Sequence, residues 1–238
     1  MTLRSAVSFL TPLGGVSAPG PRTLDWFWLV GAGLGAAVGG IWLGAAHAWP
    51  RPLAAGVAVA ADLALTGMLH FDGLLDSADG LLPPVSRARR LEIMSGPDVG
   101  AFAVGTGGAA LLLRWAALWV LRPTVLLVAG LWCLSRSAMA FAARTQPYAR
   151  DPEGGGLASA FAGRSRALPA VVGVAVAFGA ACAWRPLAGA VSVIAAALAA
   201  GGVVVLARRR LGGYTGDVLG ACGFMAETIG LLVAAARW

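Results

Sequence analysis

Long apolar stretches separated by short polar segments dominate the pattern of the chain. Most of the stretches run for about 20 residues, the length that an α-helix needs to cross the hydrocarbon core of a bilayer. The pattern therefore predicts an all-α, polytopic integral membrane protein, in which residues 1–238 form a single transmembrane helical domain of about seven spans. The predicted spans are 26–49, 53–70, 99–121, 123–143, 168–184, 186–207 and 218–236.

The polar segments between the spans are of two kinds. Some are short turns that contain Pro52, Pro123 or Pro186, as tight returns between neighbouring helices often do. Three segments are longer, and they cover residues 71–98, 144–167 and 208–217. With seven spans, these longer segments all lie on the same side of the membrane as the N-terminus.

The arginines are divided unequally between the two sides of this arrangement. The chain has no lysine, so all 18 of its cationic residues are arginines. The side of the longer segments holds Arg4, Arg22, Arg87, Arg89, Arg90, Arg144, Arg150, Arg164, Arg166, Arg208, Arg209 and Arg210. The opposite side holds Arg51, Arg122, Arg185 and Arg237. Positive charge favours the cytoplasmic side. We therefore expect a multi-pass protein of the cell (inner) membrane, with its N-terminus and polar segments in the cytoplasm.

The composition agrees with a membrane protein. Hydrophobic residues make up 58% of the chain and charged residues 12%, with a mean hydropathy of +0.78, whereas soluble domains carry about a quarter charged residues. The net charge of +7 reflects the uneven arginines, so we predict no nucleic-acid partner. Cys133, Cys182 and Cys222 lie in or beside apolar segments at no metal-binding spacing, and are predicted to be inert buried thiols. The first residues are too weakly apolar to predict a signal peptide.

Three aspartates stand close together in the sequence LHFDGLLDSADGLL. Asp72, Asp76 and Asp79 are spaced i, i+4 and i+7, which places them on one stripe of a helix. Like charges at this spacing repel one another, so a cation is expected on the stripe. Carboxylate oxygens suit Mg²⁺, which proteins hold with one or two carboxylates and substrate phosphates. A solvated acidic face and a cation pathway are the alternatives.

Candidate groups for catalysis and anion binding flank this stripe. His70 is either a packed side chain or a ligand, acid or base. Glu92 either completes the metal shell or pairs with an arginine. Arg87, Arg89 and Arg90 are candidates for bidentate binding of a diphosphate, or for anchoring at the membrane surface.

The segment RRRLGGYTGDVLGA, residues 208–221, repeats this combination of arginine, glycine and acid. Its glycines free the backbone for close approach to an anion, and Asp217 adds a carboxylate before the last span. We take Gly213, Thr215, Gly216 and Asp217 as candidate substrate-binding residues.

Three other features extend the list of candidates. Arg136 and Glu227 lie within predicted spans and predict an internal ion pair, and Arg136 is also a candidate substrate-binding residue. The basic loop 144–167 is either a substrate gate or a plain linker. Asp98, just before the span 99–121, is a candidate helix cap or ligand.

These groups favour one kind of chemistry. The sequence contains no Ser-His-Asp set, Walker loop or redox-cofactor motif. Transfer of a phosphate ester from a diphosphate to an alcohol fits best, with Mg²⁺ and arginine neutralising the phosphates. A carboxylate or a histidine would take the hydroxyl proton.

The runs TGMLHFDGLLDSADGLL, RRLEIM and LGGYTGDVLGA, taken together, resemble the cobalamin synthase family, the membrane adenosylcobinamide-GDP ribazoletransferases. The resemblance covers essentially the whole chain. It implies that the 5′-hydroxyl of α-ribazole, or of its 5′-phosphate, attacks adenosylcobinamide-GDP. Adenosylcobalamin or its phosphate then forms and GMP leaves, with Mg²⁺ required. The positions that match the family motifs are His70, Asp72, Asp76, Asp79, Glu92 and Asp217. Of these, the resemblance implies Asp72, Asp76 and Asp79 as metal-binding residues, and His70, Asp79 or Glu92 as the catalytic group that takes the hydroxyl proton.

One position departs from the family pattern. After LEIM the family commonly has an acid between two basic residues, but Gly96 stands at the acid position and Asp98 at a basic one. This departure leaves the role of Asp98 open.

Two other functions compete with this interpretation. A CDP-alcohol phosphotransferase would show DxxDGxxAR followed by a second pair of acids, and DSADGLLPPVSR lacks both. A transporter or channel would carry acids along its spans, whereas only Asp62 and Glu227 lie there. The expected partners are the two substrates and the lipid bilayer, with other corrinoid-assembly enzymes or a second copy of the chain as candidates.

Overall fold

The computed structural model describes residues 3–15, 17–150, 157–161 and 166–238. The helices are α1 (Leu3–Leu10), α2 (Phe27–Ala48), α3 (Arg51–Leu65), α4 (Leu69–Leu81), α5 (Arg87–Ile93), α6 (Ala101–Val120), α7 (Val125–Thr145), α8 (Leu168–Trp184), α9 (Pro186–Leu211) and α10 (Gly216–Ala234). Short 3-10 turns lie at Pro12–Gly14, Pro21–Trp26 and Leu157–Phe161. In the described part of the chain there is no strand, so the predicted all-α class is confirmed.

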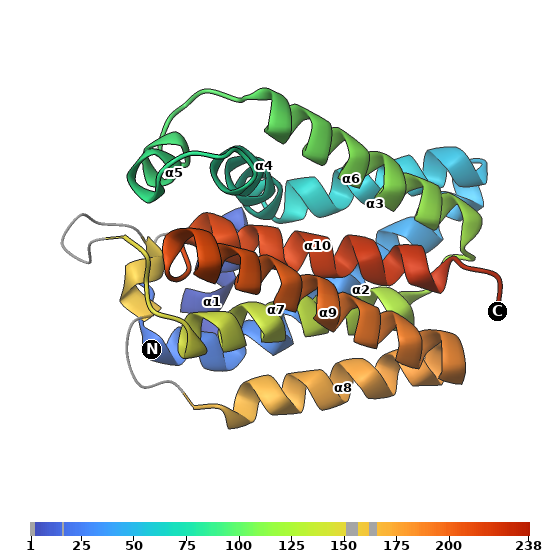
Figure 1. The fold of residues 1–238 in the computed structure, drawn as a ribbon. Helices are drawn as coiled ribbons and strands as arrows, with labels where there is room; N and C mark the ends of the chain where they lie inside the picture. Colours follow the sequence, from blue (N-terminus) through green and yellow to red (C-terminus); the bar gives the residue numbers. More distant parts are fainter. Residues whose placement is uncertain (1–2, 16, 151–156, 162–165) are drawn as a thin grey trace.

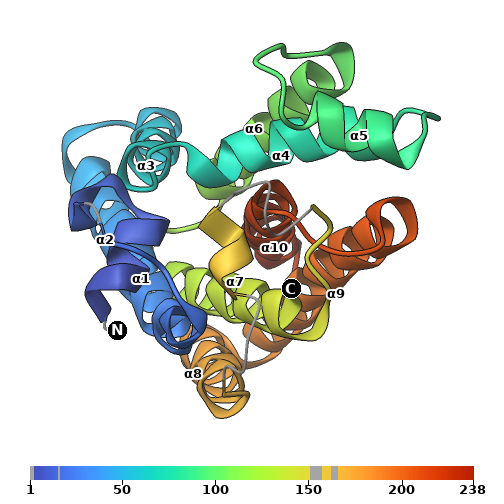
Figure 2. The ribbon, with the colours of Figure 1, turned by 90° about the vertical axis from the view of Figure 1, so that its left-hand side faces the viewer.

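Helices α7 and α10 form the centre of the bundle. The end view in Figure 2 shows the other long helices arranged around them. In both central helices 72% of the most apolar segment is buried, against 28% in α9. The outer helices therefore present large apolar side chains outward, as lipid-facing helices do; Leu112, Leu187 and Leu198 are each at least 66% exposed.

A stripe of glycines brings α2 directly against α7. A Cβ atom added to Gly31 or Gly35 would lie 2.5 or 2.6 Å from a backbone oxygen of α7. Gly39, one turn further on, faces the first turn of α7 in the same way. Small residues at four-residue spacing allow such backbone contact between membrane helices.

The predicted second span, 53–70, is wrong at its end. Helix α3 stops at Leu65, and the chain turns by 87° into α4. Gly67 and Met68 at the turn both have φ near +60°, a left-handed conformation that a helix cannot continue through. As a result α4 lies across one end of the bundle, where Figure 1 shows it nearly end-on.

The other predicted spans match helices to within a few residues, but the count of seven is not confirmed. Within the described residues, five helices are long and apolar enough to cross a membrane, or six if the bent pair α3 and α4 is one span. Helix α8 is apolar but shorter, at 17 residues. In Figure 1 α1 and the C-terminus lie at opposite ends of the bundle, an arrangement that needs an odd number of passes.

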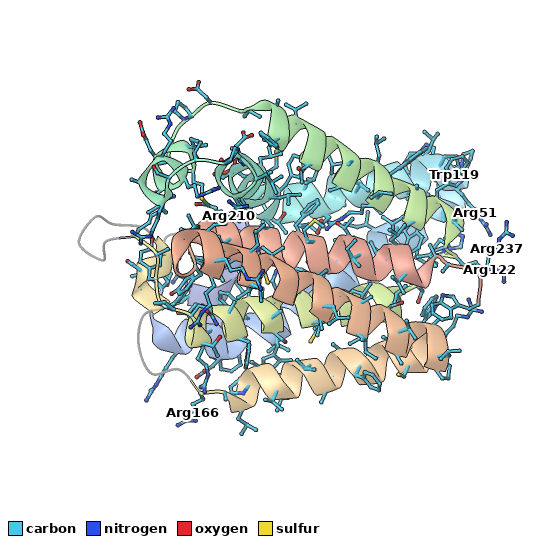
Figure 3. The ribbon with its side chains drawn as sticks, in the orientation of Figure 1. Arg51, Trp119, Arg122, Arg166, Arg210 and Arg237 are labelled. Carbon is cyan, nitrogen blue, oxygen red and sulfur yellow. The ribbon has the colours of Figure 1, made fainter. Side chains whose placement is uncertain are left out.

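The structure separates the arginines between the two ends of the bundle as the sequence predicted. Figure 3 shows Arg51, Arg122 and Arg237 together at one end, beside Trp119. Arg166 and Arg210 lie toward the opposite end, where α4 and α5 are also found (Figures 1 and 3).

A buried network of charges joins four helices through the middle of the bundle. Arg114 of α6 forms ion pairs with Asp62 of α3 and, at 3.0 Å, with Glu227 of α10. Arg136 of α7 also pairs with Glu227, which confirms the predicted ion pair. None of these four side chains is more than 5% exposed. The two positive and two negative charges balance, which is how ionised groups are accommodated away from water.

Candidate functional site

Helices α4 and α10 cross with their backbones in contact, and this crossing assembles the candidate site. A Cβ atom on Gly73 would lie 2.7 Å from the carbonyl oxygen of Asp217, and one on Gly220 would lie 3.2 Å from Cα of His70. Because both crossing positions are glycine, the helices can approach this closely. The crossing places Asp72, beside Gly73 on α4, next to Asp217 in the first turn of α10.

The three aspartates of the predicted stripe lie on one helix, as predicted, but differ in burial. Asp72 is exposed, Asp76 is half-buried, and Asp79 is buried. Asp76 lies within electrostatic reach of Asp72 and Asp217, and Arg150 is the cation that offsets these acids. Negative charge is thus concentrated between α4 and α10.

Asp79 holds the beginning of α6. Its Oδ2 accepts a hydrogen bond from the backbone N–H of Gly100 at 2.6 Å, and its Oδ1 accepts one from Ala103 at 2.9 Å. This carboxylate does for α6 what an N-cap side chain does, since the first N–H groups of a helix have no partner within it. Asp98 was a candidate for this cap, and that expectation is wrong: Asp98 is exposed, and the cap comes from Asp79. The metal-binding and catalytic roles of Asp79 remain predictions.

A cavity of about 460 Å³ opens beside the crossing. Its polar lining includes His70, Asp72 and Asp217 from the two crossing helices, and Arg150 from the loop after α7. The full lining is Ser8, Phe9, Thr11, Pro12, Thr66, Gly67, Leu69, His70, Asp72, Met139, Tyr148, Arg150, Ala158, Gly216, Asp217 and Gly220.

Arg150 ties the loop after α7 to the acidic cluster. Its Nη2 lies 3.1 Å from Oδ2 of Asp217, and it also donates to the carbonyl oxygen of Met94 at 3.2 Å. Burial raises the pKa of the neighbouring Tyr148, with Arg150 opposing and Asp217 adding to that rise. Burial also raises the pKa of Tyr214 to about 12, so both phenols stay protonated at neutral pH.

His70 lies at the base of the cavity wall. It is 2% exposed, and neither ring nitrogen has a hydrogen-bond partner within the described chain. Buried polar groups without partners are uncommon in proteins and call for an explanation, such as a ligand or a water.

The arginines of α5 make structural contacts. Arg87 donates to the carbonyl oxygens of Leu211 and Ala149, each at 2.7 Å. Arg90, 3% exposed, donates to the last carbonyls of α4 at 2.8 and 2.9 Å. These donors stabilise helix ends, so the diphosphate-binding role of both arginines remains a prediction.

Of the two alternatives for Glu92, the structure shows the ion pair. Glu92 pairs with Arg89 at 2.7 Å, and the two side chains are 68% and 57% exposed. The predicted catalytic role of Glu92 and substrate-binding role of Arg89 stay predictions.

The glycine-rich turn before α10 packs against protein backbone. A Cβ atom on Gly213 would lie 2.0 Å from the carbonyl oxygen of Pro147, and Tyr214 donates to that oxygen at 2.9 Å. Thr215 is the N-cap of α10, accepting from Val218 at 3.2 Å. Gly216 lines the cavity. The glycine-rich turn was predicted to approach an anion closely, whereas in the structure its backbone closely approaches the loop after α7.

The structure also bears on the predictions for the cysteines, for loop 144–167 and for Arg136. Cys133 and Cys222 are free and buried as predicted, while Cys182 is half-buried. The predicted roles of loop 144–167 fall partly on residues 151–156 and 162–165, which lie outside the described residues. Predicted substrate binding by Arg136 stays a prediction; it is fully buried, and its Nε and Nη2 have no partner within the described chain.

The sequence analysis missed Arg150, Tyr148 and the contribution of α1 to the cavity. Ser8 and Phe9 of α1 line the cavity, and neither residue belongs to a motif that the sequence analysis identified. The loop residues Tyr148 and Arg150 had no periodic signal, and their proximity to Asp217 arises from the tertiary fold. In the described part of the chain, no three His, Cys, Asp or Glu side chains converge closely enough to hold a metal by themselves.

Fold and site together define a multi-pass membrane protein with an acidic, arginine-containing cavity at one end of its bundle. The family model described as Cobalamin-5-phosphate synthase matches residues 2–235. The chain is 35% identical to an adenosylcobinamide-GDP ribazoletransferase of Chlorobaculum parvum, over 91% of this chain and 86% of the relative. It is 39% identical to one of Leptothrix cholodnii, over 82% and 78%. It is 34% identical to one of Chlorobaculum tepidum, over 98% and 95%. No solved structure matches.

The chain belongs to the cobalamin-5-phosphate synthase family. It is therefore an enzyme of cobalamin biosynthesis and a transferase, and the resemblance identified from its motifs is confirmed.

Proposed function

We propose that this protein joins α-ribazole, or its 5′-phosphate, to adenosylcobinamide-GDP. Adenosylcobalamin or its 5′-phosphate forms, and GMP leaves. Two of the relatives named above as adenosylcobinamide-GDP ribazoletransferases align with 91% and 98% of this chain. The observation that carries the proposal is the crossing of α4 and α10, which gathers Asp72, Asp76 and Asp217 beside the cavity.

The donor set fits a hard divalent cation. All three side chains are carboxylates, and they repel one another unless a positive charge lies between them. Proteins usually hold Mg²⁺ with one or two carboxylates and complete its shell with substrate phosphates. A preformed three-residue cluster is therefore not needed before the diphosphate arrives. When bound, Mg²⁺ would neutralise charge on the diphosphate and on the leaving GMP.

The chain's own residues supply the rest of the chemistry. Arg150, paired with Asp217 at 3.1 Å, lies where its guanidinium can also contact a phosphate entering the cavity. His70 lines the same cavity, and both of its ring nitrogens are buried without a hydrogen-bond partner within the described chain. We propose that its imidazole turns toward the cavity when the substrates bind, so that one nitrogen accepts the hydroxyl proton of the acceptor. The phosphorus–oxygen bond to the acceptor forms as the bond to GMP breaks. The proton leaves through His70 or a carboxylate of the cluster.

We further propose that the cavity opens to the cytoplasm. Charged residues are expensive within lipid, and the arginine distribution favours the end that carries α4 and α5 as the cytoplasmic one. Both substrates are polar and water-soluble, and adenosylcobinamide-GDP is also large and charged, which suits an active site at the membrane surface.

The test is product analysis with the purified protein in detergent or liposomes. Incubation with adenosylcobinamide-GDP and α-ribazole phosphate should give GMP and a cobalamin product in equal amounts. Release of CMP from a CDP-alcohol, without release of GMP from adenosylcobinamide-GDP, would instead identify a CDP-alcohol phosphotransferase.

A further inference from the structure

The cavity beside the acidic cluster is lined by charged, hydroxyl-bearing and apolar side chains, and the hydroxyls belong to Ser8, Thr11, Thr66 and Tyr148. Asp72, Asp217 and Arg150 provide charge. Phe9 of α1 and Met139 of α7 provide apolar surface. A ligand that fills this cavity therefore needs both a polar part and an apolar part.

The size of the cavity selects between the two substrates. At about 460 Å³ it lies within the range of roughly 300–1,000 Å³ that holds small molecules. A nucleoside fits in such a space. Adenosylcobinamide-GDP carries a corrin macrocycle, an adenosyl group and a nucleotide, and it is too large to enter whole.

The apolar lining selects further between the two bases. The benzimidazole of α-ribazole carries no donor and a single acceptor, its free ring nitrogen. It can therefore lie against Phe9 and Met139 with only that one atom left for a hydroxyl of the lining to pair. Guanine carries several donors and acceptors, so the same position against Phe9 and Met139 would leave more polar atoms for the hydroxyls of the lining to pair.

His70 adds an observation that itself points to a ligand. It is 98% buried by side-chain and backbone atoms, it lines the cavity, and both of its ring nitrogens lack a partner within the described chain. Both nitrogens are closed off from solvent, so a sugar hydroxyl donates to one of them once the imidazole turns toward the cavity. Ribose would then lie between the apolar base and the carboxylates.

We propose that this cavity is the binding site of the acceptor nucleoside, with its base against Phe9 and Met139 and its ribose toward His70 and Asp72. The corrinoid stays outside, and only its diphosphate reaches the acidic cluster. This inference rests on the proposed function, because that function supplies the two substrates.

Substituting Gly216 with residues of increasing size fills the cavity step by step. The nearest heavy atom to an added Cβ would be Cβ of Ala158 at 3.7 Å, an ordinary contact distance. Gly216→Ala is therefore accommodated, whereas the longer side chain of Gly216→Leu occupies the space of the ligand. Leu69, 45% exposed on the cavity wall, gives a second variant, Leu69→Trp, that leaves the core unchanged. Gly105→Leu on α6 is the matched control, since no heavy atom lies within 4 Å of its added Cβ.

Two measurements test the proposal: equilibrium dialysis with α-ribazole in the absence of corrinoid, and steady-state kinetics with each substrate varied. Gly216→Leu and Leu69→Trp should raise the Kd and KM for α-ribazole by about tenfold or more. The KM for adenosylcobinamide-GDP should change by less than about twofold, and Gly105→Leu should match the native protein. A rise confined to the KM for adenosylcobinamide-GDP would overturn the assignment of the cavity while leaving the function intact.

Failure of the proposed function gives a different result. The native protein would then release no GMP from adenosylcobinamide-GDP under any condition. If it also binds no α-ribazole in dialysis, this inference falls with the function. If it binds α-ribazole and Gly216→Leu abolishes that binding, the cavity assignment stands on its own.

Discussion

Gly73 of α4 lies directly against Asp217 of α10, so close that a Cβ atom at Gly73 would come within 2.7 Å of the Asp217 carbonyl oxygen. The oxygen belongs to the backbone of α10, and a Cβ atom is fixed rigidly to the backbone of α4, so neither can move aside as the end of a flexible side chain would. The geometry of the acidic cluster therefore depends on a residue that has no side chain.

Replacing Gly73 tests this dependence. Gly73→Ala should force α4 and α10 apart, destabilise the protein by about 1–3 kcal/mol, and lower turnover strongly. The measurements are thermal unfolding in detergent and the rate of GMP release. Gly33→Ala on α2, where no heavy atom lies within 4 Å of the added Cβ, should leave both unchanged. Equal behaviour of the two variants would contradict the role of the crossing.

A second prediction concerns the cap of α6. Asp79→Asn keeps one acceptor oxygen but places an N–H donor opposite a backbone N–H, so it should destabilise the protein by about 0.5–2 kcal/mol. Thermal unfolding and hydrogen exchange at Gly100 and Ala103 should both report the loss. Asp98→Asn is the control, because Asp98 lies beside the same helix end but is exposed. A larger effect from Asp98→Asn would show that the cap is misassigned.

The buried charge network should contribute strongly to stability. Arg114→Met removes the cation shared by Asp62 and Glu227, and breaking a buried pair in this way costs about 3–5 kcal/mol. Arg89→Met breaks the exposed pair with Glu92 and should have little measurable effect. Comparing the thermal unfolding midpoints of the two variants checks this, and similar midpoints would count against the network.

The arginine distribution predicts the orientation of the bundle. A reporter fused after Trp238 should lie on the outer side of the membrane, and one fused before α1 should lie in the cytoplasm. Protease protection or a compartment-specific reporter enzyme gives the answer. A cytoplasmic C-terminus would refute the orientation, and finding both termini on the same side would refute the odd number of passes.

Most of the fold could be predicted from the spacing of apolar and polar residues along the sequence. Apolar stretches of spanning length located α2, α6, α7, α8, α9 and α10 to within a few residues, and the spacing of Asp72, Asp76 and Asp79 placed them on one helix. The bend between α3 and α4 was missed because hydropathy stays high through it. It depends on the left-handed backbone of Gly67 and Met68, which hydropathy does not report.

Site residues that meet only through tertiary contacts were harder to predict from the sequence. Arg150 and Asp217 are 67 positions apart in the chain and pair only in the fold. Arg90 illustrates an ambiguity that the sequence leaves open, because an arginine in a polar segment is equally compatible with binding phosphate and with capping a helix. The carbonyls of Gly80 and Leu81 that it contacts have no signature in the sequence.

The most direct test of the central claim is the Mg²⁺ dependence of GMP release in the native protein and in Asp76→Asn. If the carboxylates between α4 and α10 hold the metal, GMP release should require Mg²⁺ and stop with a chelator. Asp76→Asn should then lose turnover by about 100-fold or more, while its thermal unfolding stays near that of the native protein. Full turnover in Asp76→Asn, or undiminished GMP release in the presence of chelator, would contradict the account.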